Sequence, residues 1–534
     1  MTNTTTADTN CFGQNLTSGL SKGVRYTLLI VFSVILLLGI FNGYRMCAYG
    51  MNFSDEPYHI INAMDYKNAP MTVLNALIGH AFGNIFGWNY LNFRYLAWTF
   101  DLLAILTAGS FLLWKTRDWL VSVGFTSSIV VYESISPLLF RLYGWDCLAA
   151  LILTVILCFT LYYCDRPKKA ILILLSIITG LAILIKAPNV FLVPVISAFI
   201  WWKFRKISEV AVFSSISIIL AATGIIIIYG SPSVFIQYLH LNNNPEHGSI
   251  ITLLKVGLID VVRILPYITF YLALFYIIFK ISNAKLWMIL IAMALCIAVN
   301  HYINIIHFGE EARLIWPCIA ISVIVVAMTK NLPVGFILFA VSYISVIGSD
   351  RGLLKFVSFS TTLVALAYIV NRQNLKTAVI CGTVLFLSSS VFRYSKACAS
   401  SFNDAGMHYL TETIDAPAVI KGMHTTQERV NLINRTIDLT NGKGTFVVGD
   451  TVNIYLYELI FDNINPYLRQ AFGKRDNYQK KPYVDSIESH VNRAPQGMQY
   501  LYLSNDTTTL MYGMLHEKMP LQRRSDDFIL FVKE

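Results

Sequence analysis

The sequence is dominated by a succession of apolar runs, each long enough to cross a bilayer core about 30 Å thick. Hydrophobic residues make up 55% of the chain and charged residues only 13%, which excludes a water-soluble enzyme and a disordered chain. The predicted fold class is a polytopic α-helical membrane protein with about thirteen transmembrane helices. The runs lie at about 25–46, 93–114, 119–140, 146–164, 170–186, 189–202, 210–229, 258–279, 286–306, 312–329, 332–348, 353–370 and 376–393.

The charges in the short loops predict the orientation of these spans. Lys and Arg are retained on the cytoplasmic side of a membrane, and the basic pairs and triplets fall on one side if the spans alternate. Residues 1–24 are then a disordered cytoplasmic N-terminus, and 25–394 form the transmembrane domain with a long outside loop at 47–92. Thirteen crossings place residues 395–534 outside. The basic residues concerned are Lys22, Arg25, Lys115, Arg117, Arg166, Lys168, Lys169, Lys203, Arg205, Lys206, Lys280, Lys285, Lys330, Arg372 and Lys376.

The region from residue 395 onward differs from the rest in composition. It holds 15 Lys and Arg against 16 Asp and Glu, so the net charge of +10 belongs to the membrane part. That excess is explained by loops facing an anionic membrane surface, and nucleic acid is not expected as a partner. A helical pattern at about 425–440 and strand-like runs at 445–448, 499–503 and 528–532 predict a small outside α/β domain. Of nine cysteines only Cys398 lies there, so no disulfide framework supports it.

The outside loop at 47–92 contains two features. Residues 75–86 carry apolar side chains at helical spacing, which predicts an amphipathic helix that either lies in the membrane interface or packs as a short structural helix. Asp55 and Glu56 stand in the segment Ser54–His59, about ten residues after the first span. A helix with Pro57 at its first helical position and Ser54 or Asp55 as its cap is one interpretation of this segment, and chemistry is the other.

Three segments resemble the GT-C superfamily of integral-membrane glycosyltransferases, which includes protein O-mannosyltransferases and the lipid A aminoarabinose transferase. An Asp-Glu pair after the first span is the first. The segment Gly180–Pro188, GLAILIKAP, is similar to the GLAxLxKGP segment of bacterial members, with Ala187 in place of the usual Gly. The third is Arg141–Asp146, RLYGWD, in the second outside loop. The tail lacks the WWDYG-like segment of oligosaccharyltransferases, which argues against transfer of a whole oligosaccharide to Asn.

The resemblance implies a GT-C fold and a sugar transfer from a polyprenyl-phosphate-linked donor to a lipid, glycan or protein acceptor. Such a transfer needs a base for the acceptor hydroxyl and cations for the departing phosphate. Asp55 is the expected base, with Glu56 as its substitute. Lys186, Arg313 and Arg141 are the expected phosphate-binding residues. No cofactor is certain, and a divalent metal ion is one interpretation of the remaining acceptor-side or metal-binding candidates, which are Asp146, His301, His307 and Glu310.

Other motifs and alternatives bear on this hypothesis. The sequence has no Walker A loop, no Gly-rich dinucleotide turn, no HExxH and no GxSxG motif, so a soluble nucleotide-sugar donor is not expected. An inverting transferase in a bacterial inner membrane, with its site and tail in the periplasm, is the prediction. A polyprenyl-diphosphate-type glycan polymerase or ligase and a lipid or sugar transporter stay open as alternatives. The sequence names neither the sugar nor the acceptor.

Overall fold

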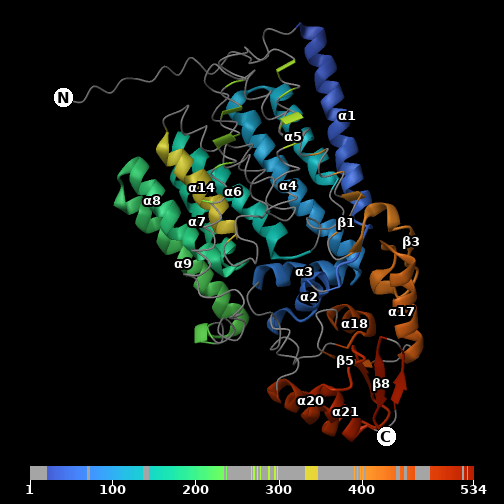
Figure 1. The fold of residues 1–534 in the computed structure, drawn as a ribbon. Helices are drawn as coiled ribbons and strands as arrows, with labels where there is room; N and C mark the ends of the chain where they lie inside the picture. Colours follow the sequence, from blue (N-terminus) through green and yellow to red (C-terminus); the bar gives the residue numbers. More distant parts are fainter. Residues whose placement is uncertain are drawn as a thin grey trace, which may run out of the picture.

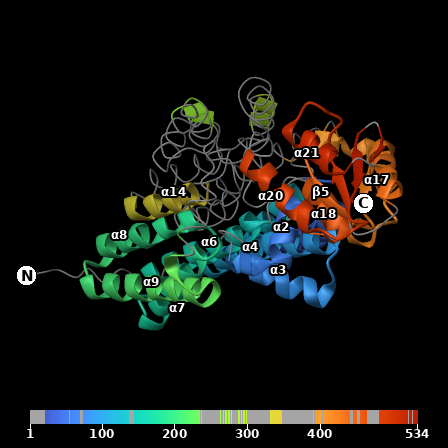
Figure 2. The same cartoon turned by 90° about the horizontal axis from the view of Figure 1, so that it is seen from below.

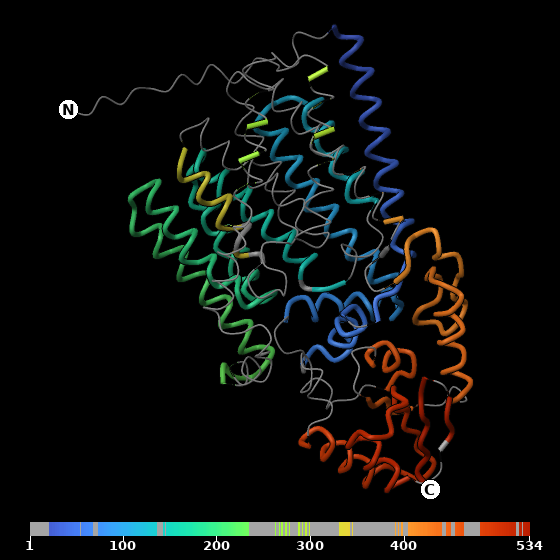
Figure 3. Tube along the Cα trace, viewed as in Figure 1, coloured from blue at the N-terminus to red at the C-terminus, as the bar shows by residue number. Residues whose placement is uncertain are grey.

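The structure is a computed structural model. It describes residues 21–53, 55–68, 73–135, 143–233, 331–346, 404–440, 445–449, 454–463, 481–519, 522–525 and 527–534, with isolated positions between them. Figure 3 traces the chain from the first helix to the C-terminus and marks the remaining residues in grey.

The first half of the chain forms a bundle of long helices (Figure 1). Five helices of the described part are long and apolar enough to cross a membrane, among them Lys22–Met46 and Ile207–Tyr229. Apolar side chains on the outer side of the first helix are largely exposed, with Leu37 at 65% and Phe41 at 69%, as expected for a surface that faces lipid. The bundle consists of α1 (Lys22–Met46), α4 (Tyr90–Thr116), α5 (Trp119–Ser134), α6 (Trp145–Asp165), α7 (Lys169–Ile183), α8 (Leu192–Phe204), α9 (Ile207–Tyr229) and α14 (Leu332–Val346).

Three shorter elements lie between α1 and α4, and one lies between α7 and α8. The first three are α2 (Asp55–Met64), η2 (Tyr66–Asn68) and α3 (Val73–Phe86), and the last is η3 (Ala187–Phe191). In Figure 1, α2 and α3 lie across one end of the bundle, which we call the α2 end. The helix predicted at 75–86 is therefore confirmed as α3.

Glycines allow α1 to approach its neighbours closely. The helix packs along α5 and also contacts α4. A Cβ built on Gly43 would lie 2.2 Å from the ring of Trp98, and one on Gly39 would lie 3.1 Å from Val130. Small residues at such contacts bring helix backbones together where no water is present to drive association. The position of α1 in the bundle therefore depends on these two glycines.

The end of the bundle opposite α2 carries the described basic loops and several ion pairs. Arg25 at the start of α1 lies 3.3 Å from Asp118, whose side chain also caps α5 by accepting from the backbone of Leu120. The ammonium of Lys115 contacts the carboxylate of Asp165 at the α6 terminus. These pairs neutralise charges where helices turn at the membrane surface. The described basic loops lie away from the α2 end, as the orientation prediction requires.

The chain from Ser400 onward forms a small α/β unit, which we call the tail domain. Its sheet has the order β5-β6-β8-β7, with β5 parallel to β6 and the other neighbours antiparallel. Figures 1 and 2 place it at the α2 end, with α18 beside α2. Its larger elements are α17 (Gln427–Thr440), β5 (Thr445–Val448), α18 (Ile454–Phe461), α20 (Lys481–Arg493), β6 (Gln499–Tyr502), α21 (Leu510–Lys518), β7 (Gln522–Arg524) and β8 (Ile529–Val532).

Several short elements precede α17. They are β1 (Ser400–Ser401), β2 (Asp404–Ala405), η6 (Met407–Tyr409), β3 (Glu412–Thr413), η7 (Ala418–Ile420) and β4 (His424–Thr425), with β1 pairing to β2 and β3 to β4. The predicted helix and three strands of the tail are confirmed as α17, β5, β6 and β8. The α/β architecture expected for this region is thereby observed.

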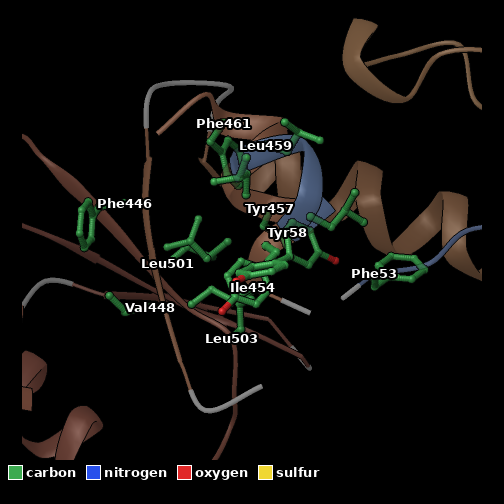
Figure 4. Packing of buried hydrophobic residues seen from close by; sticks show 14 of the residues in the cluster. Phe53, Tyr58, Phe446, Val448, Ile454, Tyr457, Leu459, Phe461, Leu501 and Leu503 are labelled. Atoms are coloured by element: carbon green, nitrogen blue, oxygen red, sulfur yellow. The ribbon is translucent and has the colours of Figure 1, made fainter. Parts of the chain in front are cut away.

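The tail domain and the loop after α1 share one hydrophobic core. Phe53 and Tyr58 from the loop join Ile454, Tyr457 and Leu501 from the tail in a single cluster of buried side chains (Figure 4). The rings of Tyr58 and Tyr455 meet edge to face at 5.4 Å between centroids. Burial of such aromatic side chains dominates the energetics of protein cores. The shared core therefore fixes the tail domain to the α2 end.

The spans expected at about 258–279, 286–306, 312–329, 353–370 and 376–393 lie outside the described residues, apart from isolated positions. The count of thirteen therefore stays a prediction, as does the boundary at residue 395. The spans expected near 25–46, 93–114, 146–164, 189–202 and 210–229 correspond to helices long and apolar enough to cross a membrane.

The orientation can be tested by fusions at the C-terminus. With the basic loops in the cytoplasm, we expect the tail domain on the opposite side of the membrane. Alkaline phosphatase fused after Glu534 should be active in intact cells, and a fluorescent protein at the same position should be dark. A bright fluorescent fusion with an inactive phosphatase would overturn both the orientation and the side assigned to the α2 end.

Candidate active site

The α2 helix begins at the predicted acidic pair and presents its two members differently. Asp55 is its first residue and is partly exposed, whereas Glu56 is completely buried. The backbone N–H of Asp55 donates to Oδ1 of Asn52 at 2.8 Å, so Asn52 supplies a capping interaction. Ser54, the other cap considered from the sequence, lies outside the described residues. The acidic pair is therefore divided into one partly exposed and one fully buried residue.

The buried carboxylate is bound by Arg94, the fifth residue of α4. Nε of Arg94 donates to both oxygens of Glu56 at 2.9 and 3.1 Å, and Nη2 donates to Oε2 at 2.8 Å. Nη1 donates to the backbone carbonyls of Cys47, Tyr49 and Gly50 at 3.0, 3.2 and 2.8 Å. Both side chains are fully buried. One guanidinium thus joins α4, α2 and the segment that follows α1.

Burial raises the pKa of the Glu56 carboxyl, and the positive charge of Arg94 opposes that rise. A carboxylate whose two oxygens are held by one guanidinium has little capacity to accept a proton from a substrate hydroxyl. The arrangement favours Asp55 for chemistry and a positioning part for Glu56. The prediction that Glu56 is catalytic stays a prediction.

The start of α6 lies against α2. The hydroxyl of Tyr143 donates to the backbone carbonyl of Asn75 in α3 at 2.6 Å, and the backbone N–H of Tyr143 hydrogen-bonds Glu56. A Cβ built on Gly144 would lie 3.0 Å from Cδ2 of His59, one turn beyond Asp55. Gly144 therefore permits the close approach that brings the second predicted loop to the α2 helix.

Two of the predicted site residues form an ion pair at this end of the bundle. Nζ of Lys186 lies 3.6 Å from Oδ1 of Asp146 in the first turn of α6. Lys186 is only 6% exposed, although it stands at a break between α7 and η3. The Asn189 side chain donates to the carbonyl of Ala182 at 2.8 Å and so connects η3 to the last turn of α7. The segments of the RLYGWD and GLAILIKAP motifs therefore meet.

The start of α3 is hydrogen-bonded to the break between α7 and η3. The backbone N–H of Leu74 donates to the carbonyl of Leu184 at 3.0 Å. Because α3 packs on α2, this bond connects the Lys186 turn to the helix that carries Asp55. Asp55, which is partly exposed, and the ion pair of Lys186 and Asp146 thus lie at the same end of the bundle, on α2, α6 and the turn before η3.

The remaining predicted site residues lie outside the described part of the chain: Arg141, His301, His307, Glu310 and Arg313. Among the residues that the structure describes, no group of three or more His, Cys, Asp and Glu side chains is arranged to hold a metal ion. The metal hypothesis, which needs three of the residues named here, stays a prediction.

Sequence reasoning assigned no part to Asn52, Tyr90 or the contacts of Arg94. The hydroxyl of Tyr90 donates to the carbonyl of Asn52, and the Arg94 guanidinium lies 5.2 Å from the Tyr90 ring centroid. The available signal was an arginine inside an apolar run, because such a charge needs a partner. The identity of that partner had no signal, since Glu56 is 38 residues away.

No family model and no curated protein matches this chain. Among solved structures, the chain is similar to ArnT from Cupriavidus metallidurans in the apo state, with 12% identity, a TM-score of 0.49, and coverage of 96% of this chain and 98% of that chain. A second structure of that protein, bound to undecaprenyl phosphate, gives 12% identity, coverage of 94% and 97%, and a TM-score of 0.46.

The archaeal oligosaccharyltransferase AglB from Archaeoglobus fulgidus, in complex with an inhibitory peptide and a dolichol-phosphate, is similar as well. The identity is 13%, the TM-score is 0.44, and the alignment covers 93% of this chain and 71% of that chain. At such identities and TM-scores, the activity has to be argued from the residues of this chain.

The buried ion pair yields a stability prediction. Glu56→Gln leaves the Arg94 charge buried without a counter-ion, and breaking a buried pair in this way typically costs about 3–5 kcal/mol. We expect a correspondingly lower free energy of unfolding for the detergent-purified protein, measured by denaturant titration.

Lys206→Ala is the matched control. Lys206 pairs with Glu209 at 3.1 Å, but its side chain is 60% exposed, and Glu209 keeps a hydrogen bond from Tyr163 at 2.7 Å. Loss of an exposed pair should cost less than about 1 kcal/mol. Equal free energies of unfolding for Glu56→Gln and Lys206→Ala would contradict the prediction that the buried pair stabilises the α2 end.

Proposed function

We propose that this protein is a membrane glycosyltransferase of the GT-C kind. It moves a sugar from a polyprenyl-phosphate-linked donor to a lipid, glycan or protein acceptor. The observation that carries the proposal is the ion pair of Lys186 and Asp146, because it joins two of the three segments on which the sequence resemblance rests, while Gly144 of the same loop packs against His59 of α2. The base and the phosphate-binding groups of one site have to lie together, although these segments are up to about 130 residues apart in the sequence.

Asp55 has the properties needed for a general base. It is partly exposed, its backbone is fixed through Asn52, and the neighbouring Glu56 charge is compensated by Arg94. The positive end of the α2 dipole also favours a negative group at this position. In the proposed step the Asp55 carboxylate takes the proton of the acceptor hydroxyl, whose oxygen forms a bond to the anomeric carbon.

The bond between that carbon and the phosphate oxygen breaks in the same step, and the electron pair leaves with the polyprenyl phosphate. Attack from the face opposite the phosphate inverts the anomeric carbon. Lys186 supports departure of the phosphate. An ammonium group has three donors, so that of Lys186 can bind a phosphate oxygen beside its carboxylate partner Asp146.

The proposed location is the outer face of a cytoplasmic membrane, in bacteria the periplasmic face. The described basic loops lie at the opposite end of the bundle from Asp55, which supports this orientation. A lipid-linked donor suits the site, since the α2 end lies at one end of the long apolar helices, where the headgroups of a bilayer are expected.

The base assignment predicts the effect of Asp55→Asn. Removal of a general base typically lowers the rate by about a hundredfold to ten-thousandfold. We expect such a loss in transfer from a polyprenyl-phosphate sugar, measured as single turnover, with unchanged gel filtration and melting temperature. A parallel assay with a polyprenyl-diphosphate donor tests the polymerase or ligase alternative.

Asp65→Asn is the control, because Asp65 follows directly after the other end of α2. It should keep turnover close to that of the unmodified protein. Near-normal turnover in Asp55→Asn would exclude Asp55 as the base and leave Glu56 or Asp146 to be examined.

The leaving-group assignment predicts the effect of Lys186→Ala and Arg313→Ala. Loss of one group that stabilises developing charge commonly lowers the rate about a hundredfold to a thousandfold. Both variants should therefore react slowly even at saturating lipid donor, and Lys186→Arg should recover part of the rate.

Lys203→Ala serves as the matched control, because Lys203 lies in the last turn of α8, at the opposite end of the bundle. Unchanged single-turnover rates in Lys186→Ala and Arg313→Ala, with only stability altered, would reduce both residues to anchors at the membrane interface.

A further inference from the structure

Backbone hydrogen bonds connect the segment between α1 and α2 to the tail domain. His424 of β4 donates its N–H to the carbonyl of Ala48 at 2.7 Å and accepts from the N–H of Gly50 at 2.8 Å. The side-chain rings of Tyr49 and His424 stack at 4.7 Å between centroids. Residues 48–50 thus add to the β3–β4 hairpin as a short strand would, and we call residues 47–53 the added segment.

Asp404 makes the next contact along the added segment. Its Oδ2 accepts from the backbone N–H of Met51 at 2.8 Å and from Oγ1 of Thr425 at 2.9 Å, and its Oδ1 accepts from the N–H of Ala405 at 2.8 Å. Met51 is fully buried and lies 353 residues before Asp404. Hydrogen bonds to a carboxylate are among the stronger ones in proteins, so this contact fixes the Met51 backbone.

The next residue transmits that position to α2. Asn52 is fully buried, and its side chain accepts from the backbone N–H of Asp55 at 2.8 Å. A continuous series of contacts therefore runs from the Asp404 carboxylate through Met51 and Asn52 to the first residue of α2. Arg94 holds the same segment from the bundle side through its bonds to three backbone carbonyls.

We propose that Asp404 is a positioning residue for Asp55, so that the tail domain is a working part of the active site in the bundle. The inference rests on the proposed function for its kinetic consequence. Asp404 lies at β2, close to where the chain enters the tail domain, so it connects that entry point to the α2 end. Displacement of a reacting group by about 1 Å can cost a hundredfold in rate, which makes such a contact consequential.

The test uses the full-length protein in detergent and two measurements. Asp404→Ala removes all the acceptors, so hydrogen exchange of the amides in residues 47–64 should become about tenfold to a hundredfold faster, as expected for lost bonds to a charged acceptor. In steady-state transfer, kcat should fall by about tenfold to a hundredfold with little change in donor KM, because Asp404 acts by holding the Met51 backbone and is not one of the proposed phosphate-binding residues. Asp404→Asn keeps one acceptor oxygen, so its exchange rates and its kcat should lie between those of the unmodified protein and those of Asp404→Ala.

Asp527→Ala is the matched control, since this tail carboxylate pairs with Arg435 at 3.3 Å on the surface and does not touch the added segment. It should leave both measurements unchanged. Normal exchange in residues 47–64 and normal kcat in Asp404→Ala would overturn the proposal. A lower kcat with normal exchange would also overturn it, because Asp404 would then act on the reaction directly.

The two measurements separate this proposal from the proposed function. If the unmodified protein transfers no sugar from any polyprenyl-linked donor, the function fails while the exchange result still decides whether Asp404 holds the added segment. Where Asp404→Ala does not fold, Asp404→Asn supplies both readouts, and its exchange and kcat must both depart from those of the unmodified protein for the proposal to stand.

Discussion

The Glu56–Arg94 ion pair is the interaction on which the geometry of the α2 end depends. A charged group at the edge of an apolar bundle costs several kcal/mol unless it is paired and hydrogen-bonded. Arg94 meets that requirement with contacts to the buried Glu56 carboxylate and to three backbone carbonyls, of which those of Cys47 and Gly50 are buried and that of Tyr49 is partly buried. Since these acceptors belong to α2 and to the added segment, neither element can shift along α4 without leaving a buried charge unpaired.

The tail domain completes this arrangement from the other side. The added segment has bundle contacts through its carbonyls and tail contacts through Ala48, Gly50 and Met51. A loop of this kind would otherwise expose backbone groups, and burial without partners would be costly. The shared core of Phe53 and Tyr58 with the tail side chains removes apolar surface from water at the same place (Figure 4). Polar satisfaction and apolar burial therefore favour the same docked position.

Much of the fold was accessible from local patterns in the sequence. Long apolar runs predicted α1, α4, α6 and α9, because a helix is the only open chain structure that satisfies its own backbone in lipid. The α17 helix was predicted from the helical pattern at about 425–440, and in the structure Oγ1 of Thr426 accepts from the N–H of Arg429 at 3.3 Å near its start. In the same way, the short apolar runs of the tail predicted β5, β6 and β8.

Other elements carried weak or no local signal. The α18 helix is buried on almost every side, so its eight residues show no helical period, and β7 is a polar edge strand of sequence QRR. The amphipathic spacing of Tyr483, Val484, Ile487 and Val491 in α20 was present but not recognised. The contacts of Arg94 and Asp404 depend on segments distant in sequence, and a single sequence does not pair them.

Helix geometry explains why Asp55 and Glu56 differ in burial although they are adjacent. Successive residues of a helix point about 100° apart, so one member can face the protein interior while the next faces outward. Here the longer side chain of Glu56 reaches Arg94, and Asp55 stays at the exposed start of the helix. The two acids therefore suit different tasks although they are adjacent. A general base works only if its position is fixed. Glu56 helps to fix Asp55 through its ion pair with Arg94, which also compensates the Glu56 charge.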